Sequence, residues 1–173
     1  MTDLETYPSY SINTFRKHSA PLIDVRSPNE FNQGHWPSAI NIPLFSDEER
    51  AIIGTAYKKE GRKNAIIKGL QFTSNKLPQL KERLINECKK NKCCNLKLYC
   101  WRGGMRSFSM AWLAKISNLT PVLLKGGYKS YRNWSLEQFR QNLHLILIGG
   151  KTGTGKTSIL LKLQERGIAI IDL

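Results

Sequence analysis

The segment Leu96-Lys97-Leu98-Tyr99-Cys100-Trp101-Arg102-Gly103-Gly104-Met105-Arg106-Ser107 joins an apolar run to a cysteine, two glycines and two arginines. The apolar run 96–99 predicts a β-strand, and the pattern of residues 107–117 predicts a helix. A strand that passes through a short loop into a helix is the building unit of α/β folds. The segment therefore predicts that Cys100 begins a loop between the end of a strand and the start of a helix.

This position suits a nucleophilic thiolate better than an inert buried thiol. Backbone N–H groups at a helix N-terminus attract anions, and Arg102 and Arg106 add positive charge beside the cysteine. Such surroundings lower the pKa of a cysteine from about 8.5 towards the ~3.5–7.5 range of activated thiols. We expect Cys100, Arg102 and Arg106 to be the catalytic residues.

The loop by itself leaves two kinds of chemistry open. Five residues separate Cys100 from Arg106, as in Cys-dependent phosphatases and arsenate reductases, whereas the loops of ordinary sulfurtransferases are usually one residue shorter. Transfer of sulfur-type groups and phosphate chemistry are both compatible with this spacing.

The rest of the first 135 residues alternates between predicted strands and predicted helices. This alternation predicts an α/β domain over residues 7–135, with a largely parallel sheet wound on both sides. Its active site would lie at the carboxyl ends of the strands, where Cys100 is placed. The expected strands are 22–26, 39–42, 96–99 and 121–124, and the expected helices are 27–31, 46–68 in pieces, 77–92, 107–117 and 131–139.

A second pattern begins at residue 143. A predicted strand, 143–148, leads into a phosphate-binding loop, which is followed by a predicted helix, 158–166, and a strand, 167–172. The loop amides would hold a di- or triphosphate, Lys156 would neutralise it, and Thr157 would ligate Mg²⁺. We expect residues 140–173 to be the first β-α-β unit of an incomplete P-loop domain, too small to bury its apolar faces alone. The phosphate-binding residues are Gly150, Gly153, Gly155, Lys156 and Thr157.

The charge of the chain points to a polyanionic partner. Twenty-seven Lys and Arg against thirteen Asp and Glu give a net charge of +14, concentrated in residues 58–63 and 76–97, which favours a nucleic acid. Cys88, Cys93 and Cys94 lack the spacing of a zinc site, so no metal site is expected from them. Neither a signal peptide nor a membrane span is recognisable, which predicts a cytoplasmic protein without membrane contact.

Several motifs together carry a resemblance to known families. Asp24-Val25-Arg26-Ser27-Pro28, continued by Glu30-Phe31, Gly34-His35 and Asn41-Ile42-Pro43, together with the Cys100 loop and Gly126-Gly127-Tyr128, strongly resembles a rhodanese domain. Segments 49–58, 69–70, 99–107 and 126–132, joined to the phosphate-binding loop, resemble bacterial tRNA 2-selenouridine synthase.

The resemblance implies a reaction and its partners. In that family selenium from selenophosphate replaces sulfur in 2-thiouridine at the tRNA wobble position, through an S-geranyl intermediate made with geranyl diphosphate. Cys100 would then carry selenium, Arg102 and Arg106 would hold the phosphate, and the P-loop would grip the diphosphate. The partners implied are tRNA and an enzyme that supplies selenophosphate.

Two alternatives remain beside this implication. One is a Cys-dependent phosphatase or arsenate reductase, and the other is an inactive rhodanese-like module that binds tRNA. Family members are longer than this chain, so it resembles a member truncated in its P-loop domain. We therefore expect the rhodanese half to fold and geranyl transfer to be weak or absent.

Overall fold

The chain forms two compact units, residues 1–138 and 139–173, in a computed structural model that describes residues 7–141 and 146–171. The first unit is built on a five-stranded sheet in which every pairing is parallel. The strand order is β1-β5-β4-β2-β3, which places β4 at the centre of the sheet and β3 at one edge. The strands are β1 (Ser9–Tyr10), β2 (Leu22–Asp24), β3 (Ile40–Asn41), β4 (Asn95–Tyr99) and β5 (Thr120–Leu124).

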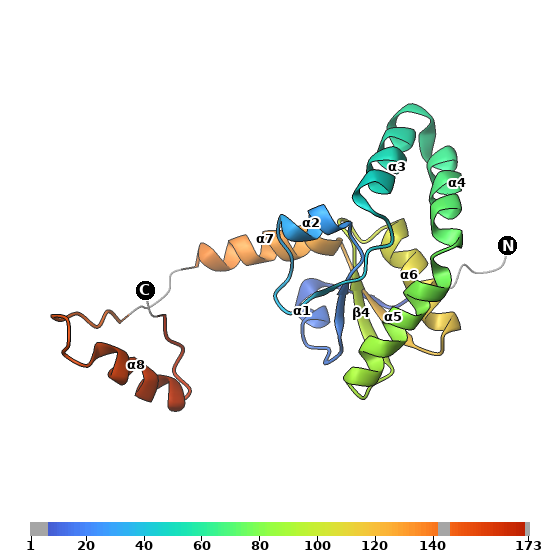
Figure 1. Cartoon of the computed structure of the whole chain (residues 1–173). Coiled ribbons are helices and arrows are strands. Elements are labelled where there is room, and N and C mark those ends of the chain that lie inside the picture. Colours follow the sequence, from blue (N-terminus) through green and yellow to red (C-terminus); the bar gives the residue numbers. More distant parts are fainter. Residues whose placement is uncertain (1–6, 142–145, 172–173) are drawn as a thin grey trace. The chain divides into compact units, whose positions relative to one another are not determined.

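Helices cover both faces of this sheet, as the alternating pattern predicted (Figure 1). No helix in the two described ranges is long and apolar enough to cross a membrane. The helices of the first unit are α1 (Ile12–Phe15), α2 (Pro28–Asn32), α3 (Asp47–Lys59), α4 (Gly61–Ser74), α5 (Leu77–Lys90), α6 (Met105–Ile116) and α7 (Gly127–Phe139).

The side chains of β4 show why the sheet is covered on two sides. Successive residues of a strand point to opposite faces, so Leu96 and Leu98 pack into one core cluster with residues of α5 and α6. Tyr99 packs into a second cluster on the other face, with Phe15 of α1. A central strand that is buried on both faces confirms the rhodanese-like, doubly wound arrangement.

Serine caps set the starts of two helices that follow loops near the site. Ser27 and Ser46 each form a capping box with a glutamate three residues later, which satisfies N–H groups in the first turns of α2 and α3. Helix α3 ends at Glu60, because Gly61 adopts a positive φ of 87° and the chain turns back into α4. The region predicted to be helical in pieces is thus a helical hairpin, which projects from the sheet in Figure 1.

The second unit differs from the prediction. Its one helix among residues 146–171 is α8 (Lys156–Glu165), and residues 146–148 and 168–171 form no strand. The predicted residues 143–145 and 172 lie outside the described ranges. A parallel strand needs a neighbouring strand and a covered face, and here Leu147 is 90% exposed while α8 has no buried residue. The β-α-β unit is therefore corrected to a loop and one helix.

Replacing Leu84 of α5 by alanine tests which contacts hold the first unit together. Leu84 is 1% exposed and packs in the core beneath the sheet, so we expect Leu84→Ala to lower the free energy of unfolding by about 2–5 kcal/mol. The matched control is Leu70→Ala in α4, where the side chain is 64% exposed and the expected change is within about 0.5 kcal/mol. Urea denaturation, followed by circular dichroism, measures the free energy of unfolding of both variants. Equal decreases in the two variants would contradict this packing.

Candidate functional site

Cys100 follows the last residue of the central strand β4, at the carboxyl edge of the parallel sheet. It is 3% exposed, and its position agrees with the predicted strand–loop–helix order. Helix α6 begins at Met105, five residues after the cysteine, with Gly104 as its N-cap. The thiol therefore lies at the N-terminus of a twelve-residue helix, where the helix dipole favours an anion.

Two groups from the loop and the helix contact the sulfur directly. The backbone N–H of Gly104 donates to Cys100 Sγ at 3.3 Å, and the Ser107 hydroxyl lies 3.3 Å from the same atom. Hydrogen bonds donated to a sulfur stabilise its thiolate form. Ser107, which sequence reasoning treated only as the start of a helix, is thus a member of the site, because one turn of α6 brings its side chain back to the loop.

The shape of the Cys100 loop depends on close packing against the first turn of α7. The N–H groups of Tyr128 and Lys129 donate to the carbonyls of Cys100 and Trp101 at 2.8 and 3.0 Å. Gly127 adopts a φ of 59°, and a Cβ on it would lie 2.3 Å from the Cys100 carbonyl oxygen. Only a glycine fits between these two backbones.

The two predicted arginines lie in different surroundings. Arg102 is exposed on the loop. Arg106 points towards α2, where its Nη1 and Nη2 atoms donate to the two carboxylate oxygens of Glu30 at 2.5 and 3.2 Å. The anion-binding role of Arg106 stays a prediction, and the structure adds that its guanidinium is held by a carboxylate.

Glu30 is a site residue that sequence reasoning did not find. Burial tends to raise its pKa, but the hydrogen bonds and charge of Arg106 outweigh burial and lower the pKa of the carboxyl below its usual value of 4.5. The same carboxylate accepts the Ser27 N–H at 3.1 Å and lies 3.7 Å from Arg50 Nε. The sequence signals only its capping role, because its partner Arg106 lies 76 residues away.

A buried ion pair lies beneath the loop. Arg26 is fully buried, donates to both carboxylate oxygens of Asp24, and stacks on the ring of Tyr128 at 3.8 Å from its centroid. Its guanidinium also lies 5.7 Å from the ring of Trp101, the residue after the cysteine. Arg26 Nη1 is buried and makes no hydrogen bond within the described part of the chain. The charges of Arg26 and Asp24 compensate each other, so the pair adds no net charge to the floor of the loop.

The predicted phosphate-binding residues form a closed turn in the second unit. Lys156 Nζ donates to the carbonyls of Gly150 and Lys151, both at 2.8 Å, which folds the lysine across the loop. Gly153 and Gly155 have positive φ values of 85° and 80°, as the turn requires. Thr157 follows on the exposed first turn of α8. The five residues thus lie on one closed turn, and its identity as a P-loop and its ligand stay predictions.

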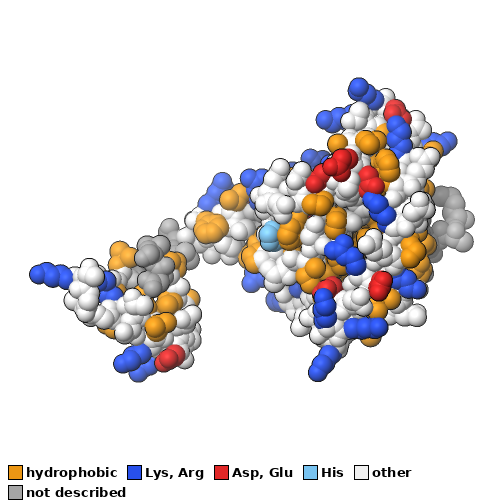
Figure 2. All heavy atoms as spheres, viewed as in Figure 1, with side chains coloured by type: hydrophobic (Ala, Val, Ile, Leu, Met, Phe, Trp, Pro, Cys, Tyr) orange, Lys and Arg blue, Asp and Glu red, His pale blue; other side chains and the backbone are white. Residues whose placement is uncertain are grey.

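Cationic side chains cover two parts of the first unit (Figure 2). At the free end of the α3–α4 hairpin, Lys58, Lys59, Arg62 and Lys63 are all exposed. Arg62 Nη2 reaches to 4.0 Å from the sulfur of Met105, so this basic end adjoins the first residue of α6 beside the Cys100 loop.

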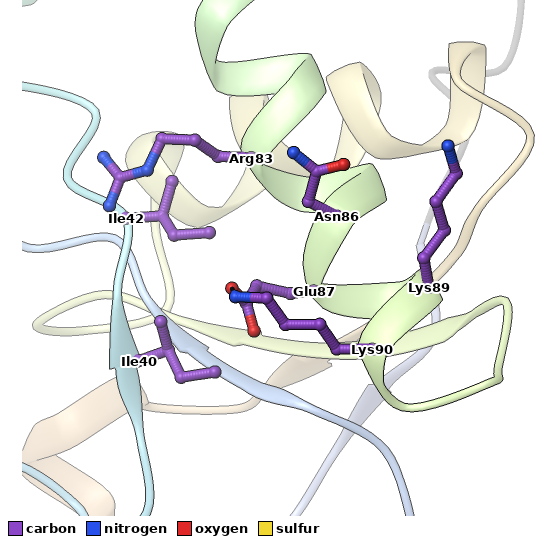
Figure 3. A pocket seen from close by; sticks show the side chains of 7 residues that line it. All are labelled: Ile40, Ile42, Arg83, Asn86, Glu87, Lys89 and Lys90. Atoms are coloured by element: carbon purple, nitrogen blue, oxygen red, sulfur yellow. Dashed lines mark hydrogen bonds and ion pairs between the residues drawn. The ribbon is translucent and has the colours of Figure 1, made fainter.

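The second basic area is a groove of about 400 Å³ between the edge strand β3 and α5 (Figure 3). Two isoleucines of the β3 segment face charged and polar side chains of α5 across it. Arg83 donates to the Asn41 carbonyl at 2.8 Å, and Lys90 pairs with Glu87 at 2.7 Å. No group of three or more metal-binding side chains gathers anywhere in ranges 7–141 and 146–171. The lining residues are Ile40, Ile42, Arg83, Asn86, Glu87, Lys89 and Lys90.

The ion pair between Glu30 and Arg106 predicts a pH-dependent stability. Because the pKa of Glu30 is lower in the fold than in the unfolded chain, the pair stabilises the fold above pH 4.5, and this contribution disappears as the pH falls through the folded-state pKa. We expect Glu30→Gln to lose about 1–3 kcal/mol at pH 7 and progressively less below pH 4.5.

Urea denaturation at several pH values measures this difference between Glu30→Gln and the unmodified chain. Glu82→Gln on the exposed face of α5 is the matched control, and its free energy of unfolding should follow that of the unmodified chain at every pH. A deficit of Glu30→Gln that persists undiminished in acid would contradict the ion-pair explanation.

Most of this chain is similar in sequence to known proteins. Over 156 residues the chain is 41% identical to a Sulfurovum protein named tRNA 2-selenouridine synthase, a match that covers 86% of this chain and 41% of that protein. The protein of the same name from Proteus mirabilis is 39% identical, with 92% of this chain and 44% of that protein covered. The chain thus spans less than half the length of these relatives.

A solved structure and a family model cover the first unit. The structure titled N-terminal domain of a putative ATP/GTP binding protein from Clostridium difficile 630 has a TM-score of 0.69 and 36% sequence identity, covering 74% of this chain and 98% of that chain. The model of the rhodanese-like domain matches residues 11–133, which include the Cys100 loop, its supporting turn and Glu30. By this match, the chain belongs to the rhodanese-like domain family.

Proposed function

We propose that this chain acts in the replacement of sulfur by selenium in the 2-thiouridine of tRNA, as a tRNA 2-selenouridine synthase. The observation that carries the proposal is the Cys100 thiol, which accepts an N–H at the start of α6 in a chain 38–41% identical to proteins of that name. The P-loop-like turn in the same chain supports it, because ordinary sulfur transfer does not require a second phosphate site.

Cys100 is the proposed carrier of selenium from selenophosphate. The thiolate attacks selenium, an S–Se bond forms, and the Se–P bond breaks with its electron pair left on phosphorus. The phosphorus product is then phosphite, whereas attack of water on phosphorus would release selenide and phosphate. The Gly104 N–H supports this role, because it donates to the sulfur that would attack, and the Ser107 hydroxyl lies 3.3 Å from the same atom.

Arg102 and Arg106 are proposed to bind the phosphate part of the donor. Arg102 is exposed on the loop and can approach an anion that arrives from solvent. Arg106 is held at Glu30, so it orients the loop and contributes a positive potential while part of its charge is compensated. The charge of the buried Arg26 beneath the loop is compensated by Asp24, so Arg26 supports the loop without adding net charge.

The P-loop-like turn is proposed to hold the diphosphate of geranyl diphosphate. Backbone amides and Lys156 suit a diphosphate. A hydroxyl such as that of Thr157 is an acceptable ligand for Mg²⁺ beside phosphate oxygens. Geranyl transfer forms a bond from the thiouridine sulfur to the prenyl carbon and releases diphosphate, so this turn would stabilise the leaving group.

The basic surfaces are proposed to contact the tRNA backbone. The exposed cations at residues 58–63 lie beside the Cys100 loop through the contact of Arg62 with Met105. Lysine and arginine contacts to phosphates position a nucleic acid and give salt-dependent affinity without reading its sequence.

Replacement of the nucleophile tests the selenium step. The chain is incubated with selenophosphate, and its intact mass and the ³¹P NMR spectrum are recorded. We expect one selenium per chain and phosphite with the unmodified protein, and neither with Cys100→Ala. Cys94→Ala, an exposed cysteine at the other end of β4, should behave as the unmodified protein. Selenium loading that survives in Cys100→Ala would overturn the assignment.

The same two variants separate the alternative functions. Nucleoside mass spectrometry of S-geranylated tRNA treated with selenophosphate should reveal 2-selenouridine that depends on Cys100. Hydrolysis of an aryl phosphate without selenium loading would instead indicate a Cys-dependent phosphatase, which the spacing to Arg106 also allows. Retention of tRNA with neither activity would indicate a binding module.

Geranyl diphosphate binding tests the second unit. We expect isothermal titration of this chain to give a Kd weaker than about 0.1 mM, because the described residues beside the loop, 146–148 and 168–171, form no strand and α8 has no buried residue to hold the loop rigid. Tight binding that is lost in Lys156→Ala would show that the turn acts without a sheet, contrary to this expectation.

A further inference from the structure

A local backbone motif brings two cysteines together at the end of α5. The N–H of Cys93 donates to the carbonyl of Cys88 at 3.1 Å, and Lys92 between them adopts a φ of 50°. This is a Schellman motif, in which the second residue after the C-cap packs against a residue of the last helical turn. Those two contacting positions are occupied here by Cys93 and Cys88.

The thiols of this pair share their surroundings. Both donate to the carbonyl oxygen of Asn95, from 3.7 Å for Cys88 and 3.3 Å for Cys93, and they lie within hydrogen-bonding reach of each other. Cys88 is 2% exposed, whereas Cys93 is half-buried. One thiol is therefore protected and its neighbour is open to a reagent.

A pocket of about 370 Å³ opens beside the pair, with an apolar floor and two lysines at its margin. Its cations, Lys89 and Lys92, attract anions, and the carboxylates of a small peptide disulfide would match them. The pocket lies at the amino end of β4, whereas Cys100 follows the carboxyl end. The two sulfur sites are therefore separate. The lining residues are Ile85, Cys88, Lys89, Lys92, Cys93, Cys94, Ser117 and Leu119.

We propose that Cys88 and Cys93 form a second sulfur site, a dithiol that reacts with small anionic disulfides and closes to an intramolecular disulfide. In the first step the Cys93 thiolate attacks one sulfur of the disulfide, a mixed disulfide forms, and one thiolate leaves. In the second step Cys88 loses its proton and attacks Cys93 Sγ, which releases the second thiol. The dithiol is oxidised by two electrons, and the external disulfide is reduced to two thiols.

Burial sets the order of these steps. Burial raises the pKa of Cys88 to about 11, and the neighbouring Cys93 is the second cause of this rise. Cys88 therefore stays protonated at neutral pH. The other charged and titratable groups around it are Cys94, Glu87, Lys89 and Lys92. Cys93 therefore reacts first, and the rate of closure should rise about tenfold per pH unit below the pKa of Cys88.

Oxidised glutathione is the probe that tests the site in the full chain. After reaction, free thiols are blocked and the chain is cleaved by trypsin without reduction, which separates Cys88 in peptide 84–89 from Cys93 and Cys94 in peptide 93–97. We expect these two peptides to be joined, in a product whose intact mass is that of one chain. The bond should form in Cys94→Ser and in Cys100→Ser and decrease at least tenfold in Cys93→Ser.

Each other outcome overturns the proposal. Loss of the joined peptides in Cys94→Ser would assign the bond to Cys94. Glutathione that stays on Cys93 at pH 9 without closure would show that the Schellman motif does not bring the sulfurs into bonding distance. No reaction at Cys93 would show that the pocket does not admit a disulfide. None of these outcomes bears on selenium loading at Cys100, so the two proposals stand or fall separately.

Discussion

The site depends on the contact between two backbone turns. The loop after β4 lies directly on the first turn of α7, and the carbonyl of Cys100 accepts the N–H of Tyr128 at 2.8 Å. At Gly127 no side chain fits, since its Cβ would overlap the same carbonyl. This contact leaves the cysteine side chain facing the first turn of α6, where Gly104 donates to the sulfur. Without the contact, the strand and helix would be joined by an unsupported loop.

Around the loop, the arginines inside the fold are paired with carboxylates, whereas other cations are exposed. Arginines that lie inside the fold are each paired with a carboxylate, Arg26 with Asp24 and Arg106 with Glu30, because an unpaired buried charge is costly. Arg102 and the cations of the α3–α4 hairpin remain exposed. The internal arginines are thus compensated by their partners, and the exposed cations are the ones available for an anionic partner.

The two ends of the sheet carry different sulfur chemistry in our proposals. At the carboxyl end, Cys100 lies at a helix N-terminus and its sulfur accepts the N–H of Gly104. At the amino end, Cys88 is kept as a thiol by burial at a helix C-terminus, with Cys93 beside it. The length of β4 separates the sites, so each can react without the other.

From the sequence alone, the strand–loop–helix around Cys100 and the parallel, doubly wound sheet were predictable, because apolar periodicity and turn residues are local signals. The glycine-rich turn at residues 150–157 was predictable too, and its phosphate binding stays a prediction. The described residues on either side of it, 146–148 and 168–171, form no strand, since strands form only where a sheet receives them. Only the tertiary structure paired Glu30 with Arg106 and placed Arg26 beneath the loop, because these contacts join residues distant along the chain. Lys92 adopts the left-handed conformation that a glycine usually adopts at a helix end, so no glycine in the sequence indicated this motif. The pairing of Cys88 with Cys93 therefore also became visible only in the folded chain.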